Sequence, residues 1–189
     1  MIFFTSKLPA SLKRGALAVM LACGTLSATA QRVALKTNAL YWAAASPNLG
    51  LELRVNRHVT LNMESTFNRL KVGKIDTRGF MFAPEARYWF SARPQAGHFL
   101  GIMALGANYN LSLDGHHYKG DALGGGLTYG YSFVLGKHWS LETTVGAGAI
   151  YRHEKNYKEA TEKEPDEANF KKWQLFPLKA GVSFVYIIK

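Results

Sequence analysis

Several serines and histidines lie near the ends of predicted strands, where a serine could act as a nucleophile and a histidine as its base. A histidine that takes the proton of a serine hydroxyl would make a nucleophile for acyl transfer. However, the chain has no Gly-x-Ser-x-Gly motif, and no spacing pairs one of these histidines with one of these serines. We therefore predict no catalytic residues among the candidates His98, His138, His153, Ser91, Ser112 and Ser140.

Two other groups contain residue types that bind metal ions. His116 and His117 lie between Asp114 and Asp121, but adjacent histidines in a loop rarely both face one ion. An acidic run at residues 162–167 lacks the glycine and the ligand spacing of a calcium loop. The sequence thus predicts no metal site and no cofactor.

Eight charged residues share another property, because each occupies an alternate position in a segment whose intervening positions are mostly apolar. Successive side chains of a β-strand point to opposite faces, so one face of these strands is polar and the other apolar. The polar face is also expected to carry Asn38, Asn62, Asn108 and Asn110. We predict that the four cations and four anions form a balanced network: Lys36, Glu52, Arg54, Glu64, Glu85, Arg87, Glu142 and Lys179.

Eight segments with this period of two would position the charges: residues 33–43, 49–55, 59–67, 78–90, 98–113, 121–135, 139–151 and 173–188. Three connections between them are compact, and three that alternate with these are longer and more polar, at residues 68–77, 114–120 and 152–172. This alternation and the even strand count are typical of outer-membrane barrels. We therefore predict an all-β fold, an eight-stranded antiparallel transmembrane β-barrel.

The placement of polar residues distinguishes a membrane barrel from a soluble β-sandwich. A sandwich buries its apolar faces, whereas a small membrane barrel turns apolar residues outward and fills its interior with side chains. Opposite charges can pair inside such a barrel, which predicts a plugged interior. Aromatic residues near the strand ends fit interfacial girdles: Tyr41, Trp42, Tyr88, Trp89, Phe90, Trp139, Tyr151, Trp173 and Tyr186. The alternative is a soluble lipocalin-like or sandwich protein with one solvated polar face.

The first thirty residues have the three-part layout of a secretory signal peptide. Three basic residues precede an uncharged stretch at residues 15–26, and Ala28-Thr29-Ala30 follows. That stretch is too short for a membrane-spanning helix, which needs about 20 residues. We predict cleavage near Ala30, with residues 1–30 as the signal peptide and residues 31–189 as an outer-membrane barrel domain.

The single cysteine and the net charge limit the partners further. Cys23 falls within the predicted signal peptide, so the mature chain would hold no thiol for a disulfide or a metal. Lipidation at Cys23 and a buried N-terminal helix are the alternatives for this segment. The formal charge of +10 suggests anionic partners, but export argues against nucleic acid.

Several segments resemble a known family: KTNALYW at residues 36–42, PNLGLE at 47–52, PEARYWF at 84–90, YGY at 129–131, LGKHWSLE at 135–142 and KAG at 179–181. They resemble a family of small Bacteroidetes outer-membrane β-barrels of unknown function, over essentially the whole mature chain. The resemblance implies the outer membrane of a Gram-negative bacterium and carries over no catalytic residue. The last strand also resembles the signal read by the barrel assembly machinery, although it ends in Ile-Ile-Lys rather than in an aromatic residue.

Four cations cluster around the third connection, where Asp76 is the only acidic residue: Arg69, Lys71, Lys74 and Arg78. Lipopolysaccharide presents phosphates at this height, and arginine or lysine can bridge them. We therefore expect a non-enzymatic, plugged barrel whose external loops contact outer-membrane lipid, lipopolysaccharide or an envelope protein. The alternatives are an outer-membrane enzyme that modifies membrane lipid and a narrow channel.

Overall fold

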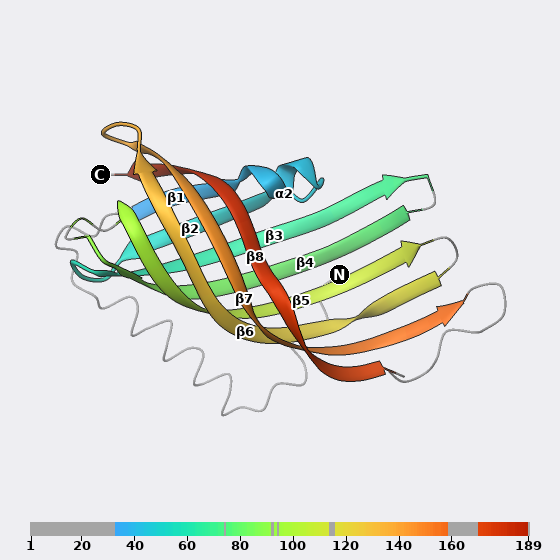
Figure 1. The fold of residues 1–189 in the computed structure, drawn as a ribbon. Helices are drawn as coiled ribbons and strands as arrows, with labels where there is room; N and C mark the ends of the chain where they lie inside the picture. Colours follow the sequence, from blue (N-terminus) through green and yellow to red (C-terminus); the bar gives the residue numbers. More distant parts are fainter. Residues whose placement is uncertain are drawn as a thin grey trace, which may run out of the picture. The chain divides into compact units, whose positions relative to one another are not determined.

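The computed structural model is a closed barrel in which each strand is antiparallel to its neighbours (Figure 1). It describes residues 33–73, 75–91, 93, 95–113, 116–158 and 170–188, so the predicted signal peptide lies outside the described residues. Neighbouring strands follow chain order, and β8 closes the ring on β1. Within the described part of the chain, no helix is both long and apolar enough to cross a membrane. The predicted eight antiparallel strands are confirmed: β1 (Val33–Asn38), β2 (Asn48–Arg54), β3 (Val59–Val72), β4 (Ile75–Trp89), β5 (Gly97–Leu113), β6 (His116–Val134), β7 (Trp139–Lys158) and β8 (Phe170–Ile188).

The strands differ in length, and the difference leaves part of the barrel wall incomplete. β1 and β2 have six and seven residues, whereas β3 to β8 have 14 to 20. β1 pairs with β8 only at residues 183–188, and β2 pairs with β3 only as far as Thr66. At one end of the barrel, which we call the rim, the wall is therefore formed by β3 to β8 alone. The opposite end carries the compact turns and is called the turn end.

A short helix, α2 (Ala39–Ala43), stands where the sequence predicts a continuation of the first strand, so the prediction for residues 39–43 is wrong. The side chain of Asn38 explains the change. Its Oδ1 accepts hydrogen bonds from the backbone N–H groups of Leu40 (3.1 Å) and Val182 (3.2 Å). Its Nδ2 donates to the carbonyl of Ala180 at 3.2 Å. One asparagine therefore caps the helix and ends the β1–β8 ladder.

We expect Asn38→Ala to lower the free energy of unfolding by about 1–2 kcal/mol, because it removes a helix cap and two links to β8. Urea unfolding followed by tryptophan fluorescence measures this change. Asn108→Ala is the matched control, since Asn108 is exposed on the outer face of β5 and should contribute less than about 0.5 kcal/mol. Equal effects of the two substitutions would contradict the role of Asn38.

The predicted long loops at residues 68–77 and 114–120 are largely strands, and β7 also extends to Lys158, so this part of the prediction is wrong. β3 and β4 pair up to Val72 and Ile75, and β5 and β6 pair up to Leu113 and His116. The hydrogen bonds of a ladder come from the backbone, so polar side chains on both faces do not end a strand.

β8 contains a bulge near the middle of its length. Lys179 pairs with Gly146 and Pro177 pairs with Ala147, which leaves Leu178 as the extra residue. The Leu178 side chain is buried in the barrel interior. A bulge is one of the few places at which a sheet accepts proline, which has no N–H donor.

The outer face of the barrel exposes apolar side chains between two aromatic pairs on β7 and β8. Trp139 contacts Tyr186 near the turn end, with ring centroids 4.9 Å apart. Tyr151 contacts Trp173 toward the rim, with ring centroids 5.3 Å apart. Val145 lies midway between these levels and is 61% exposed. We call the outward-facing apolar residues between the two aromatic levels the outer band.

Candidate functional site

Arg87 is the centre of a buried ion-pair network inside the barrel. Its guanidinium nitrogens lie 3.1 Å from Glu52, 2.7 Å from Glu85 and 3.0 Å from Glu142. All four side chains are almost fully buried. The terminal nitrogens of the guanidinium thus make charge-assisted hydrogen bonds to three carboxylates, which stabilise the arginine in the barrel interior.

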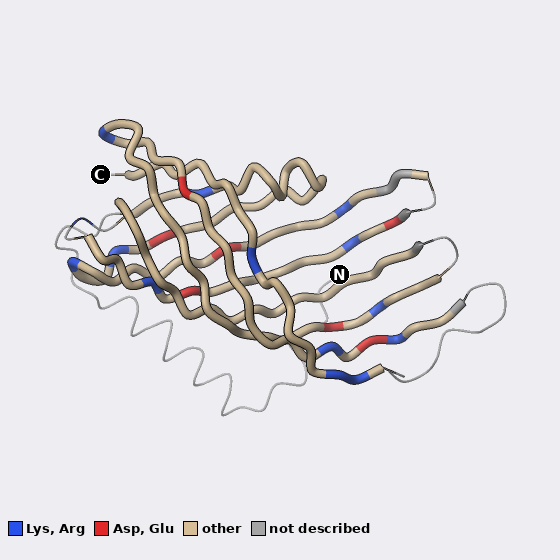
Figure 2. The backbone as a smooth tube through the Cα atoms, viewed as in Figure 1, with Lys and Arg blue, Asp and Glu red and all other residues tan. Residues whose placement is uncertain are grey.

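Two lysines extend the network across the barrel. Lys179 Nζ lies 2.7 Å from Glu64 and 3.2 Å from Glu85, and Lys36 Nζ lies 2.6 Å from Glu142. Figure 2 shows these charged positions on neighbouring strands, separated by uncharged strand from a second charged zone near the rim. The network unites seven residues from six strands: Lys36, Glu52, Glu64, Glu85, Arg87, Glu142 and Lys179.

Arg54, the eighth charge predicted for this network, does not join it. Its Nε donates to the carbonyl of Asn56 at 3.2 Å, because Arg54 is the last residue of β2 and its side chain reaches the adjacent turn. The network therefore has three cations and four carboxylates. Two threonine hydroxyl groups supply further hydrogen bonds to the carboxylates, which outnumber the cations by one. Thr128 Oγ1 donates to Glu85 at 2.5 Å, and Thr144 Oγ1 donates to Glu142 at 3.2 Å.

Two glycines make room for the network. A Cβ atom on Gly101 would lie 2.7 Å from Glu85 Oε1, and one on Gly146 would lie 2.8 Å from a methyl group of Thr128. These distances are shorter than side chains tolerate. Part of the glycine content of the strands therefore reflects the space that buried charged side chains need.

Four asparagines are predicted on the inward face, and the structure separates them into two pairs. Asn38 and Asn62 are buried inside. Asn108 and Asn110 are exposed on the outer face of β5, so their predicted placement is wrong. Met103 and Leu105 are buried, so the odd-numbered residues of this part of β5 face inward. The even-numbered residues, including both asparagines, therefore face outward.

Apolar side chains close the interior on both sides of the network. Toward the turn end, Trp89 is buried and donates to Thr60 Oγ1 at 2.9 Å, while the guanidinium of Arg87 lies 4.5 Å from the Phe99 ring centre. Toward the rim is a buried cluster: Ala83, Met103, Leu105, Ala122, Ile150 and Leu178. The described interior is thus filled with side chains at and around the level of the network.

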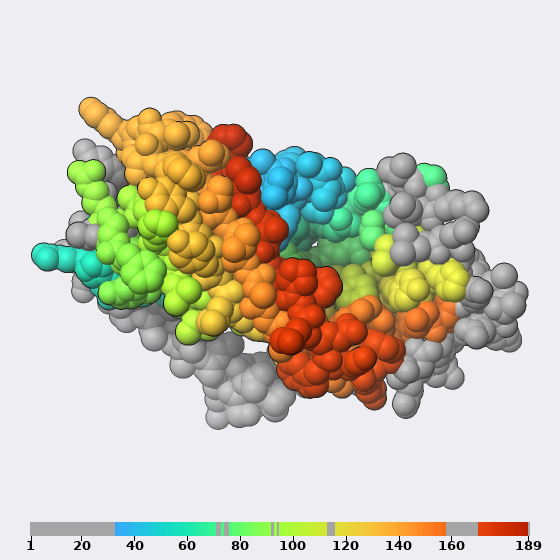
Figure 3. All heavy atoms as spheres, in the orientation of Figure 1, coloured from blue at the N-terminus to red at the C-terminus, as the bar shows by residue number. Residues whose placement is uncertain are grey.

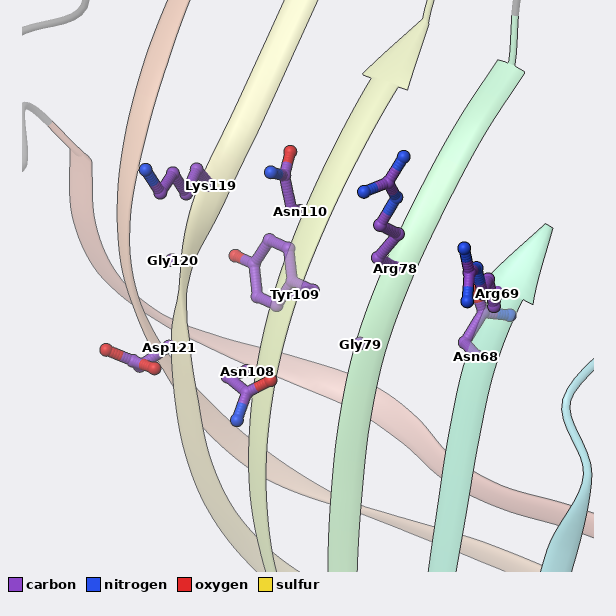
Figure 4. A pocket seen from close by; sticks show the side chains of 10 residues that line it. All are labelled: Asn68, Arg69, Arg78, Gly79, Asn108, Tyr109, Asn110, Lys119, Gly120 and Asp121. Carbon is purple, nitrogen blue, oxygen red and sulfur yellow. The ribbon is translucent and has the colours of Figure 1, made fainter. Parts of the chain in front are cut away.

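A second candidate site is a pocket of about 640 Å³ near the rim, lined by residues of β3 to β6 and here called the rim pocket (Figure 4). Arg69 on β3 and Arg78 on β4 are directly opposite in the ladder and both line it. Arg78 lies 3.3 Å from Asp76. Of the other cations predicted to contact an anion, Lys74 and the side chain of Lys71 lie outside the described part of the chain. The remaining lining residues are Asn68, Gly79, Asn108, Tyr109, Asn110, Lys119, Gly120 and Asp121.

The comparison with protein families gives one match, a family described as protein of unknown function (DUF3575), over residues 16–188. The chain belongs to this family. No curated protein and no solved structure gives a significant match. The family match covers all eight strands but brings no activity with it, so the chemistry of this DUF3575 protein has to be argued from its own side chains.

Two of the candidate histidines of the DUF3575 protein, His98 and His138, have hydrogen-bond partners other than serine. His98 Nδ1 lies 2.6 Å from the Tyr129 hydroxyl, and His138 Nδ1 lies 3.1 Å from the carbonyl oxygen of Ile187. Within the described chain, no hydrogen bond links His98, His138 or His153 to a serine. His117 stacks on Tyr157 at 5.1 Å. No three metal-binding side chains come together among the residues that the structure describes.

Sequence reasoning does not single out a polar cluster inside the barrel near the rim of the DUF3575 protein. Arg152 Nη2 lies 2.6 Å from Glu154, and Tyr109 donates its hydroxyl proton to the same carboxylate. Arg152 also donates to Gln174 Oε1 at 3.4 Å. Arg152 and Glu154 fall in a segment predicted as a loop, whereas Tyr109 and Gln174 fall in predicted strands. The alternation of inward positions through Ile150 could have identified them.

Proposed function

We propose that this chain is a plugged outer-membrane β-barrel that acts by binding at its surface rather than by catalysis. The outer band is the observation that supports the proposal most. Soluble monomers rarely expose a continuous apolar patch larger than a few hundred Å². In this barrel the apolar side chains of the outer band are exposed and the charged side chains of the network are buried, which is the reverse of the usual distribution in a soluble protein. Every strand contributes an exposed large apolar side chain: Leu35, Leu49, Leu61, Phe82, Ile102, Leu127, Val145 and Phe184.

The height of the outer band suits a bilayer. From Trp139 to Tyr151, β7 rises about 3.3 Å per residue, and with a strand tilt of about 40° this segment spans about 30 Å. That value equals the thickness of a typical hydrocarbon core, about 30 Å. Aromatic residues at both levels are expected where such a barrel meets the headgroups.

The proposal includes export by a signal peptide of residues 1–30 into the envelope of a Gram-negative bacterium, as the resemblance to Bacteroidetes barrels implies. The compact turns would face the periplasm and the rim would face the exterior. β8 would be recognised by the barrel assembly machinery during biogenesis. Lipid of the outer membrane and an envelope protein at the rim are the partners that this placement allows.

The rim pocket is proposed to bind the phosphates of lipopolysaccharide. Phe67 and Phe80 are paired on the outer face, with ring centroids 5.0 Å apart. Arg69 and Arg78 form the next outward-facing pair toward the rim, two register positions further along the ladder. Two adjacent guanidinium groups just outside an apolar surface can bind a phosphate through paired hydrogen bonds.

We expect the double variant Arg69→Glu/Arg78→Glu to lose at least half of the lipopolysaccharide that co-purifies with the barrel, because two phosphate-binding cations become anions. Quantification of lipid A phosphate per barrel measures the change. Arg57→Glu/Arg93→Glu is the matched control, since Arg57 and Arg93 are exposed in turns at the opposite end. Equal lipopolysaccharide content in both double variants would contradict the proposed contact.

The membrane location is tested by heat-modifiability on a gel, with protein from purified outer membranes and a mass for its N-terminus. We expect the unheated barrel to migrate faster than the heated chain and to begin at Gln31. Release into the periplasmic fraction with normal migration would refute the proposal, and the outer band would then need a protein partner to cover it.

A further inference from the structure

The incomplete wall near the rim gives the barrel interior an opening on its side. The segment of β8 at residues 170–177 has no strand partner on its free side within the described chain, and β3 is equally unpaired beyond Phe67. Helix α2 lies against β8 at the edge of this gap that is nearer the turn end. Figure 3 shows the surface hollowed between the blue residues of α2 and the red residues of β8, with the inner side of β3 to β6 behind.

Both edges of this opening are apolar. α2 exposes Leu40 and Trp42, which are 47% and 56% accessible. On β8, Leu175 is 89% exposed and Phe176 is 53% exposed. Phe176 pairs with Gly148 at an inward position, so its exposure follows from the missing wall opposite. An apolar surface therefore continues from the outside of the barrel to the opening.

Behind the opening is a cavity of about 390 Å³ between α2 and the inner face of β3, β4 and β5. Met81, Ala107 and Tyr109 line it and pack on the buried apolar cluster that separates it from the ion-pair network. Because apolar side chains and the network fill the barrel between this cavity and the turn end, the cavity does not continue through the barrel.

The polar atoms in the cavity are uncharged. No charged side chain is among its lining residues in the described chain, so a carboxylate or phosphate would be buried there without a counter-ion. Thr66 is 94% buried, and its hydroxyl has no hydrogen-bond partner among the described residues. Asn68 donates to Ser46 Oγ at 2.6 Å, but its Oδ1 likewise has no partner there. A hydroxyl group can accept from Thr66 and donate to Asn68 at once.

We infer that this side-opening cavity binds the hydrocarbon chain of a single-chain amphiphile with an uncharged, hydroxyl-bearing head, of the fatty alcohol or monoacylglycerol class. The chain lies against Met81, Ala107 and Tyr109, and the hydroxyl hydrogen-bonds to Thr66 and Asn68. The inference rests on the proposed membrane location only for the source of the ligand, which would diffuse from the lipid through the gap between α2 and β8.

Photo-crosslinking of the barrel in amphipol, without lipid, tests the site directly. The probe is 1-dodecanol with an alkyl diazirine in its chain, and adducts are mapped by tandem mass spectrometry. We expect adducts on the inner residues of β4 and β5. Unlabelled 1-alkanols should compete about fourfold better for each added methylene until the cavity is full. Dodecanoate should compete at least tenfold less well than 1-dodecanol.

Ala107→Trp, which fills the cavity, should reduce the adduct yield at least tenfold, whereas Ala104→Trp on the outer face of the same strand should leave it unchanged. If Ala107→Trp fails to fold on the gel, Ala44→Trp at the exposed edge of the cavity serves in its place. An unchanged yield in the cavity-filling variant, adducts confined to the outer band, or equal competition by dodecanoate would each overturn the inference. Cavity adducts on a protein that fractionates with the periplasm would refute the proposed function and leave this inference standing.

Discussion

Arg87→Met should lower the free energy of unfolding by about 3–5 kcal/mol, because it removes the cation that three buried carboxylates share and leaves two lysines for the four carboxylates of the network. Glu52, Glu85 and Glu142 all lie within 3.1 Å of the guanidinium, and water reaches almost none of their surface. The loss would appear as a large fall in the urea midpoint of the refolded barrel, read from the fraction of folded band on an unheated gel.

Arg54→Met is the matched control for this prediction. Arg54 is also an arginine on an inward position, yet it bonds to a turn carbonyl outside the network, so we expect a change below about 0.5 kcal/mol. Adding Glu142→Gln to Arg87→Met should restore part of the lost stability, since it removes one of the buried carboxylates that then outnumber the cations. If Arg87→Met and Arg54→Met unfold at the same urea concentration, the network is solvated and the interior is not plugged.

Val145→Arg is expected to destabilise the barrel in phospholipid vesicles by about 2–4 kcal/mol, the cost of an arginine at the middle of a bilayer. Val145 lies halfway along the outer band on β7. His153→Arg is matched to it, because His153 is on the same strand and the same face, eight positions nearer the rim and beyond Tyr151. At that height the expected cost is only about 0–1 kcal/mol.

The same pair of variants separates a membrane barrel from a soluble one. In water, two exposed positions on one strand would tolerate arginine equally, each within about 0.5 kcal/mol of the parent. A difference of 2 kcal/mol or more between Val145→Arg and His153→Arg in vesicles therefore requires lipid around Val145. Equal midpoints for both variants would place the outer band in water or against another protein.

The period of two was enough to predict eight antiparallel strands, because each face of a strand has its own chemistry and the alternation is visible in the letters. It also assigns Glu52, Glu85 and Arg87 to one face, and the structure brings these side chains together. Arg54 follows the same alternation but ends its strand, and only the three-dimensional path of a long side chain shows that it turns away. Polarity alone misplaced Asn108, since a polar residue near the rim is stable on either face.

The cavity had no counterpart in sequence reasoning. It exists because β1 and β2 stop early, and strand length depends on where Asn38 begins a helix rather than on hydrophobic alternation. Tyr41 and Trp42, predicted as the aromatic end of a strand, belong to that helix. The prediction that residues 152–172 form a loop likewise hid Arg152 and Glu154, which β7 carries inside the barrel.

The bulge in β8 has a consequence for how neighbouring copies of the barrel behave beside one another. A strand edge without a partner is a template on which a second chain can add, and this is a common route to aggregation. Along the free edge of β8, Pro177 offers no N–H group, the bulge at Leu178 interrupts the regular spacing, and Asn38 already occupies the groups of Ala180 and Val182. The opening in the wall can therefore persist without recruiting a neighbouring barrel, and edge-to-edge polymers of the barrel are disfavoured.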